Sequence, residues 1–219
     1  MRFAHIIALP LLFFTENQAC AEVTTDDRLW ISAAIRGELV EDLAAEFTQQ
    51  VRLPVAGEYN QQVIPGLGLA YKLLPQVSLG SGARYRFEED EGNETTRDFR
   101  IHGDVGLDSP ELGPAELGYR LRYQSESSAL MESSKNRLRN RLSLKISTGT
   151  AVRPGVFYEH FLDPQGGATK KAQKHRIGGD VSLKIKKNHR LKMRYFQDTE
   201  IDGDGDRVRV AALGYRYSL

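Results

Sequence analysis

Apolar and polar residues alternate with a period of two along most of the chain from Leu29 onward. That period puts successive side chains on opposite faces of a β-strand. In residues 77–87, for example, apolar residues alternate with Ser, Gly and Arg. Turn residues separate such segments, and short connections alternate with long ones along the chain. The pattern predicts an all-β fold, a single antiparallel up-and-down β-barrel.

The number of strands follows less directly from the pattern. The alternation yields an odd number of segments, whereas single-chain bacterial barrels have an even number. We therefore expect about 12 strands, with about 10 as the alternative, and a missing strand would lie in residues 22–28 or 58–64. Val208 and Val210 are out of step with the apolar positions that follow them. This change of phase predicts a bulge near residues 211–212.

The last segment carries an apolar face to the end of the chain, formed by Leu213, Tyr215, Tyr217 and Leu219. In a soluble protein this face would be exposed where chains usually fray, whereas a lipid bilayer would cover it. The alternation of apolar residues and tyrosines resembles the assembly signal of Gram-negative outer-membrane barrels. In that signal the final residue is most often Phe, and Leu219 departs from it. Tyrosines near other strand ends also favour a transmembrane barrel with aromatic girdles.

The amino terminus has the features of a secretory signal peptide. A basic residue precedes an apolar run over residues 3–14, and Ala19-Cys20-Ala21 supplies the small residues of a cleavage site. We expect cleavage after residue 21, so that 1–21 is removed and 22–219 forms one barrel domain in the outer membrane of a Gram-negative bacterium. Cleavage also removes the only cysteine. Disulfides and cysteine-based metal sites are thereby excluded from the mature chain.

Several short motifs point to one family. They are Trp30, Glu46 and Arg52, then Leu69-Ala70-Tyr71-Lys72-Leu73, Gly82-Ala83-Arg84-Tyr85-Arg86 and Arg137-Leu138-Arg139-Asn140-Arg141-Leu142. This arrangement resembles a family of small outer-membrane barrels that is still called a domain of unknown function. The resemblance covers nearly the whole mature chain and implies an architecture without a reaction. As partners of such a barrel we expect outer-membrane lipids, lipopolysaccharide and the outer-membrane assembly machinery.

The polar strand faces carry more cations than anions, although the whole chain is close to neutral, with 30 Lys and Arg against 29 Asp and Glu. The near-neutral total gives no reason to expect nucleic acid as a partner. We expect the following residues in the barrel interior: Arg84, Arg86, Arg100, Arg120, Arg122, Arg139, Arg141, Arg176, Arg194, Glu46, Asp104, Glu116 and Asp180. Such an interior would favour a small anionic solute, because rings of Arg and Lys select anions in pores. A structural role, in which arginines and acids fill a narrow barrel, stays open.

An outer-membrane enzyme acting on lipids or envelope polymers is the alternative function. His102 and Asp104 share a polar face, and His160 lies close to Asp163 in the sequence. No serine is recognisable as a nucleophile beside either pair. We therefore expect no catalytic residue, no metal site and no cofactor, and we favour a barrel without enzymatic activity.

Overall fold

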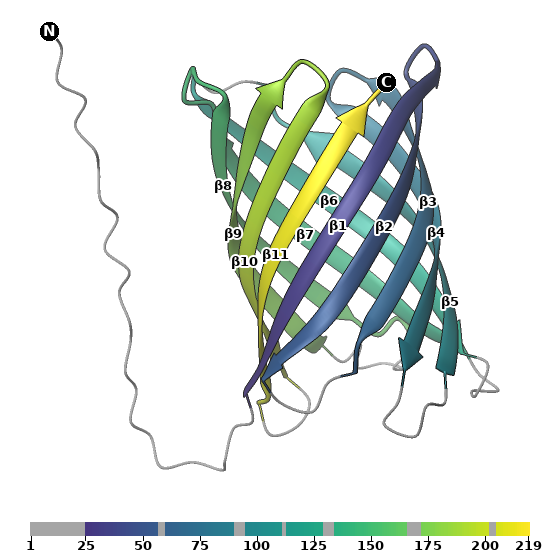
Figure 1. Cartoon of the computed structure of the whole chain (residues 1–219). Coiled ribbons are helices and arrows are strands. Elements are labelled where there is room, and N and C mark those ends of the chain that lie inside the picture. The colour runs from purple at the N-terminus through teal and green to yellow at the C-terminus, as the bar shows by residue number, and fades with distance from the viewer. Residues whose placement is uncertain are drawn as a thin grey trace, which may run out of the picture.

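A computed structural model describes residues 25–56, 60–89, 95–110, 113–128, 134–165, 172–201 and 205–219. The strands are β1 (Thr25–Val40), β2 (Leu43–Ala56), β3 (Gln62–Leu74), β4 (Val77–Glu89), β5 (Thr95–Asp108), β6 (Ala115–Ser128), β7 (Lys135–Ile146), β8 (Val152–Leu162), β9 (Ala172–Lys186), β10 (His189–Glu200) and β11 (Arg207–Ser218). Within this part of the chain they close into a single barrel (Figure 1). The predicted all-β barrel is thus confirmed, whereas the expected signal peptide, 1–21, lies outside the described residues. The described residues include no helix long and apolar enough to cross a membrane.

The first and last strands close the barrel by running parallel. β1 and β11 pair continuously from Thr25 opposite Arg207 to Arg36 opposite Ser218, and every other neighbouring pair is antiparallel. The described strands number eleven rather than an even number. An odd number of up-and-down strands leaves the two end strands pointing the same way, and a parallel ladder accommodates this without an additional strand.

The two ends of the barrel differ in their connections. What we call the turn end carries connections 41–42, 75–76, 109–114, 147–151 and 187–188, and the loop end carries 57–61, 90–94, 129–134, 163–171 and 201–206. β1 begins at the loop end, and β11 finishes at the turn end (Figure 1). There the Leu219 backbone N–H donates to the Arg36 carbonyl at 2.8 Å. The half of the barrel next to each end is called the turn half or the loop half below.

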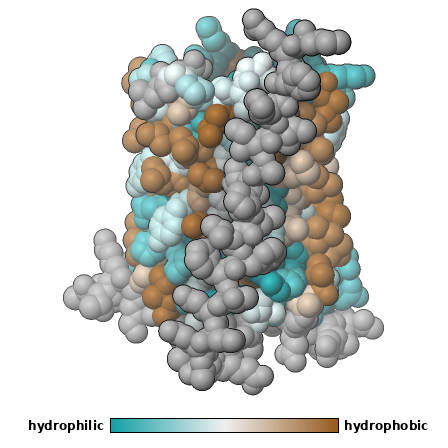
Figure 2. All heavy atoms as spheres, turned by 90° about the vertical axis from the view of Figure 1, so that its left-hand side faces the viewer, coloured by the Kyte–Doolittle hydropathy of each residue, from teal (hydrophilic) through white to brown (hydrophobic). Residues whose placement is uncertain are grey.

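Apolar side chains are exposed around the outside of the barrel. They include Leu67, Leu69, Leu107, Leu121, Leu142, Val156, Ile177, Met193 and Tyr195. Figure 2 shows hydrophobic residues over much of the visible wall and hydrophilic residues at the upper rim, which is the turn end. The buried hydrophobic cluster of Phe157, Phe196 and Val210 lies on the inward phase of β8, β10 and β11 instead. The apolar outer surface is the reverse of the arrangement in a soluble barrel, whose outer surface is polar.

The bulge expected at residues 211–212 is wrong. β11 pairs with both β1 and β10 without a register shift, and Val210 lies opposite Phe196. Val208, Val210 and Ala212 share one phase and contribute to the same apolar cluster. The change of pattern that suggested a bulge therefore marks an apolar patch on the inner face of the wall.

Candidate functional site

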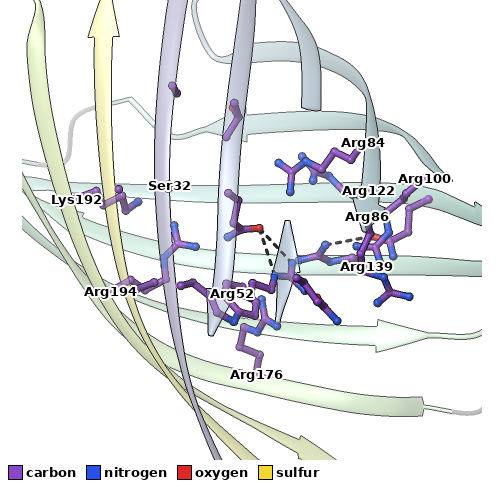
Figure 3. A pocket seen from close by; sticks show the side chains of 18 of the residues that line it. Ser32, Arg52, Arg84, Arg86, Arg100, Arg122, Arg139, Arg176, Lys192 and Arg194 are labelled. Carbon is purple, nitrogen blue, oxygen red and sulfur yellow. Dashed lines mark hydrogen bonds between the residues drawn. The ribbon is translucent and has the colours of Figure 1, made fainter. Parts of the chain in front are cut away.

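Charged side chains surround a cavity of about 610 Å³ inside the barrel (Figure 3). Among the described residues that line it, thirteen are arginine and two are lysine, against two acids, Glu46 and Asp198. The arginines expected from the sequence, Arg84, Arg86, Arg100, Arg120, Arg122, Arg139, Arg141, Arg176 and Arg194, all line this cavity. The lining is therefore rich in cations.

The period of two places arginines directly opposite one another on neighbouring strands. Arg120 lies opposite Arg141, and Arg122 lies opposite Arg139, across β6 and β7. Like charges in directly opposed positions repel one another. Carboxylates from other strands offset this repulsion, and the resulting ion pairs form three groups.

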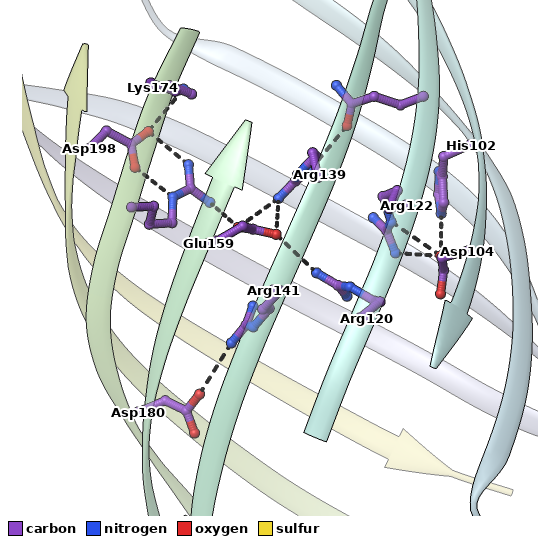
Figure 4. Close-up of polar contacts among 12 residues, drawn as sticks. His102, Asp104, Arg120, Arg122, Arg139, Arg141, Glu159, Lys174, Asp180 and Asp198 are labelled. Carbon is purple, nitrogen blue, oxygen red and sulfur yellow. Dashed lines mark hydrogen bonds and ion pairs between the residues drawn. The ribbon is translucent and has the colours of Figure 1, made fainter. Parts of the chain in front are cut away.

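The first group is centred on Glu159 of β8, which is fully buried. Arg139 Nη2 donates to both of its carboxylate oxygens at 3.0 Å, and Arg120 Nη2 donates to Oε1 at 3.3 Å (Figure 4). Arg176 Nη1 lies 3.6 Å from Oε2. Arg176 also donates to both oxygens of Asp198, through Nε at 2.5 Å and Nη2 at 2.8 Å. A buried carboxylate requires several such donors, because burial removes it from water.

The second group lies in the loop half and contains the buried acids Asp98 and Glu126. Arg86 donates to Asp98 through Nε at 2.7 Å and lies 3.1 Å from Glu126. Glu126 also accepts from Arg100 Nη2 at 2.7 Å and from Arg137 Nη1 at 3.3 Å. One carboxylate thus connects β4, β5, β6 and β7.

The third group lies in the turn half, where contacts are looser or more exposed. Asp180 lies 3.0 Å from Lys192 Nζ, 3.8 Å from Arg141 Nη2 and 4.0 Å from Arg194 Nε. The remaining pairs are Asp104 with Arg122, Glu46 with Arg216 and Glu116 with Lys145, at 2.8, 2.9 and 2.5 Å. All four acids expected from the sequence therefore pair with cations in this half.

An apolar patch interrupts the charged interior. It consists of Phe157, Phe196 and Val210, with Trp30, Val208 and Ala212 packed against it. The guanidinium carbon of Arg52 lies 4.0 Å from the ring centroid of Trp30, and that of Arg141 lies 4.0 Å from the ring centroid of Phe157. Such cation–π contacts let an aromatic ring share a wall with arginines. Sequence analysis missed this patch, although an aromatic residue on the polar phase, as at position 30, was a signal for it.

Sequence analysis also missed three buried acids, Asp98, Glu126 and Asp198. Each continues the polar phase of its strand toward the loop end, as Asp98 does two residues before Arg100. The apolar phase is weaker there, and the alternation was not extended that far. Extending the period of two to the loop end would have found all three.

The apolar face at the carboxyl terminus lies on the outside of the wall. Leu213, Tyr215 and Leu219 are exposed, and Tyr217 is partly exposed. The Tyr215 hydroxyl lies 2.6 Å from His189 Nδ1. The residues expected to form an assembly signal are therefore accessible from outside the barrel.

The two histidine–carboxylate pairs lack the hydrogen bond of a catalytic dyad. His102 Nε2 lies 3.8 Å from Asp104 Oδ2, which is beyond hydrogen-bond distance. In the second pair, Asp163 accepts from the backbone N–H of Gln165 at 2.8 Å, and no contact joins it to His160 among the described residues. Neither histidine is held in place as a general base requires. We propose no reaction on these residues.

The fold and its interior define a closed β-barrel with an ion-paired, cation-lined cavity. A model of the family described as "Protein of unknown function (DUF2490)" matches residues 27–209, and the chain belongs to this family. The predicted resemblance to a barrel family without an assigned function is thus confirmed. No curated protein and no solved structure matches the chain.

Proposed function

We propose that the protein is an integral β-barrel of the outer membrane of a Gram-negative bacterium, with an interior that favours small anions over cations. The observation that carries this proposal is the division of one wall into an apolar outer face and a charged inner face. Adjacent residues of β6 illustrate it, since Leu121 is exposed outside and Arg120 lines the cavity. Lipid would cover the apolar face, which would otherwise contact water.

The lengths of the strands support a transmembrane barrel. The shortest described strand has 11 residues and the longest has 16. A tilted transmembrane strand needs roughly 9–11 residues. Exposed tyrosines near the turn end, such as Tyr71 and Tyr119, and farther toward the loop end, such as Tyr85 and Tyr195, suit two aromatic girdles. In this proposal the wall contacts outer-membrane lipids and lipopolysaccharide, and the assembly machinery inserts it.

The orientation in the membrane follows from the connections. Outer-membrane barrels have short turns on the periplasmic side and longer loops outside. We therefore propose that the turn end faces the periplasm and the loop end faces the outside. The fifteen cations and two acids that line the cavity would raise the local concentration of anions and repel cations.

Replacement of Leu121 by Arg tests the membrane part of the proposal. If Leu121 faces hydrocarbon near the middle of the bilayer, Leu121→Arg should destabilise the folded barrel by about 2–4 kcal/mol. The measurement is a urea titration of folding into lipid vesicles, read by the heat-modifiable mobility of the folded form in a gel. The matched control is Arg120→Gln, which should still insert. If Leu121→Arg folds into lipid as stably as the wild type, the membrane proposal is wrong.

The reversal potential of the reconstituted barrel tests the anion preference. In a planar bilayer with a salt gradient, the potential should approach the equilibrium potential of the anion, because the lining is rich in Arg and Lys. A reversal potential that approaches the equilibrium potential of the cation would contradict an anion-preferring pore. A barrel that inserts without conducting would support the structural role and contradict the proposal of a pore.

A further inference from the structure

Arg84 lines the cavity without an acid in hydrogen-bond or ion-pair contact, and Glu46 and Asp104 attract it only from a longer distance. No residue that the structure describes forms a hydrogen bond or an ion pair with its guanidinium. Its neighbours across the sheet explain this, because they are Gly66 on β3 and Arg100 on β5. The next inward residue of β4, Arg86, instead lies opposite Asp98 and pairs with it.

The surroundings of Arg84 give its side chain space but leave its charge without a close acid. A Cβ atom at Gly66 would lie 2.8 Å from Arg84 Cγ, so the glycine allows the stem of the arginine to lie against β3. An unpaired cation beside a second cation is unfavourable where water is limited. An anion that enters the cavity would offset this cost.

Three further arginines and one acid border the same space. Arg84, Arg120, Arg122 and Arg216 each line both the cavity of about 610 Å³ and an adjoining cavity of about 280 Å³, and so does Glu46, which pairs with Arg216. Figure 3 shows Arg84 and Arg122 among the side chains that surround the larger cavity. Arg122 donates Nε and Nη2 to Asp104, and Arg120 donates Nη2 to Glu159. The other guanidinium N–H groups of both residues have no acceptor among the described residues.

We propose that Arg84, with Arg120 and Arg122, binds a small oxyanion that carries two or more negative charges on phosphate or carboxylate groups. A guanidinium offers paired N–H donors that match the oxygens of both groups. The cavity of about 610 Å³ lies within the size range of small-molecule sites. The excess of cations in the lining favours a multivalent anion over chloride. This site deepens the proposed function and rests on it for the anion preference of the interior.

Binding of inorganic pyrophosphate to the whole barrel tests the site. Isothermal titration calorimetry in detergent micelles, with ionic strength held constant by sodium chloride, should give saturable binding to the wild type. Arg84→Gln should weaken it about tenfold or more, because hydrogen bonds to a charged group are lost. The matched control is Arg97→Gln, since Arg97 is exposed and lies on the outward phase of the neighbouring strand β5. This control should bind as the wild type does.

Folding and location need separate measurements. Arg84→Gln removes no described partner and relieves a repulsion, so it should fold at least as well as the wild type. Arg84→Lys keeps the charge without the paired donors and should bind with intermediate affinity. Trp30 is the only tryptophan, and Arg52 stacks on it inside the barrel. Trp30 and Arg84 line the same cavity, so a change in the fluorescence of Trp30 over the same pyrophosphate range as the heat signal would place the anion inside the barrel.

Two outcomes would overturn the site: no saturable binding to the wild type, or equal affinity of Arg84→Gln. These outcomes are independent of the tests of the proposed function. A barrel that inserts and prefers anions but does not bind pyrophosphate removes this site alone. A barrel that binds pyrophosphate in micelles but fails the Leu121→Arg test removes the membrane proposal alone.

Discussion

The two halves of the barrel interior are built differently. The four buried acids that the structure describes, Asp98, Glu126, Glu159 and Asp198, all lie in the loop half, where the side chain of Glu159 is 0% exposed and that of Asp198 is 8% exposed. In the turn half the side chain of Asp104 is 16% exposed and that of Glu46 is 26% exposed. Buried ion pairs and the apolar patch therefore occupy much of the loop half, although the cavity of about 610 Å³ extends into it and is lined there by Asp198. The ion pairs of the turn half are more exposed.

Side-chain size follows the same division. The inner face of the turn half carries Ser32, Ala34, Gly68, Gly80, Gly118 and Gly214, whereas that of the loop half carries Gln62, Ile64, Phe161, Phe196 and Val210. A Cβ at Gly80 would lie 2.7 Å from Asp104 Oδ1, so this glycine leaves room for the acid beside it. Gly68 and Gly80 line the adjoining cavity of about 280 Å³, whereas the cavity of about 610 Å³ extends into both halves. The difference teaches that the sizes of inward side chains, together with strand number, affect how much space a narrow barrel encloses.

The largest difference in stability between the two halves is expected when Glu159 is replaced. Glu159→Gln keeps the shape of the side chain but leaves Arg139 and Arg176 without their shared carboxylate. Removing one partner of a buried ion pair costs about 3–5 kcal/mol, because the other charge stays buried and uncompensated. The measurement is the free energy of unfolding from a urea titration in lipid vesicles.

The matched control in the turn half is Glu116→Gln. It removes a pair with Lys145 in which the two side chains are 28% and 46% exposed. An exposed pair contributes about 0–1 kcal/mol, so this variant should unfold close to the wild type. If the two variants lose similar amounts of stability, the loop half is no more a structural core than the turn half is.

The inward phase of the central strand segments could be predicted from the sequence. A strict period of two leaves one assignment for residues such as Arg120 and Arg122 once the apolar phase is placed outside. The partners of those arginines could not be predicted in the same way. Arg139 meets Glu159 because β7 and β8 pair in one particular register, and the period of each strand alone does not determine the register of its neighbour.

The apolar patch inside the barrel shows a second limit of the pattern. The apolar side chain of Val210 predicts an outward phase for this residue, and a bulge would be needed to keep that phase in step with Leu213 and Tyr215. Its burial depends on Phe196 and Trp30, which come from other strands. Contacts among distant strands therefore decided the local pattern in β11, and hydrophobicity along the strand did not reveal them.

The number of strands was the third point that the sequence did not determine. The alternation along the sequence yields an odd number of segments, and the rule of even strand numbers predicts one more or one fewer. That rule holds when the first and last strands are antiparallel. The parallel pair of β1 and β11 removes the requirement and places the start of β1 at the opposite end from the finish of β11.

The smallest expected effect concerns this topology and leaves stability nearly unchanged. In the proposed orientation a short epitope tag directly before Thr25 lies at the loop end, and the same tag after Gly149 lies at the turn end, in connection 147–151. Both positions are exposed, so each insertion should change the free energy of unfolding by about 0.5 kcal/mol or less. Antibody should label the first tag on intact cells and the second only after the outer membrane is permeabilised.

The labelling pattern separates two claims, because topology and orientation make independent predictions. If both tags are labelled from the same side, the chain crosses the membrane an even number of times between them, which contradicts the seven strands from β1 to β7. If the second tag is labelled on intact cells and the first is not, the odd number of crossings from β1 to β7 holds but the barrel is inverted.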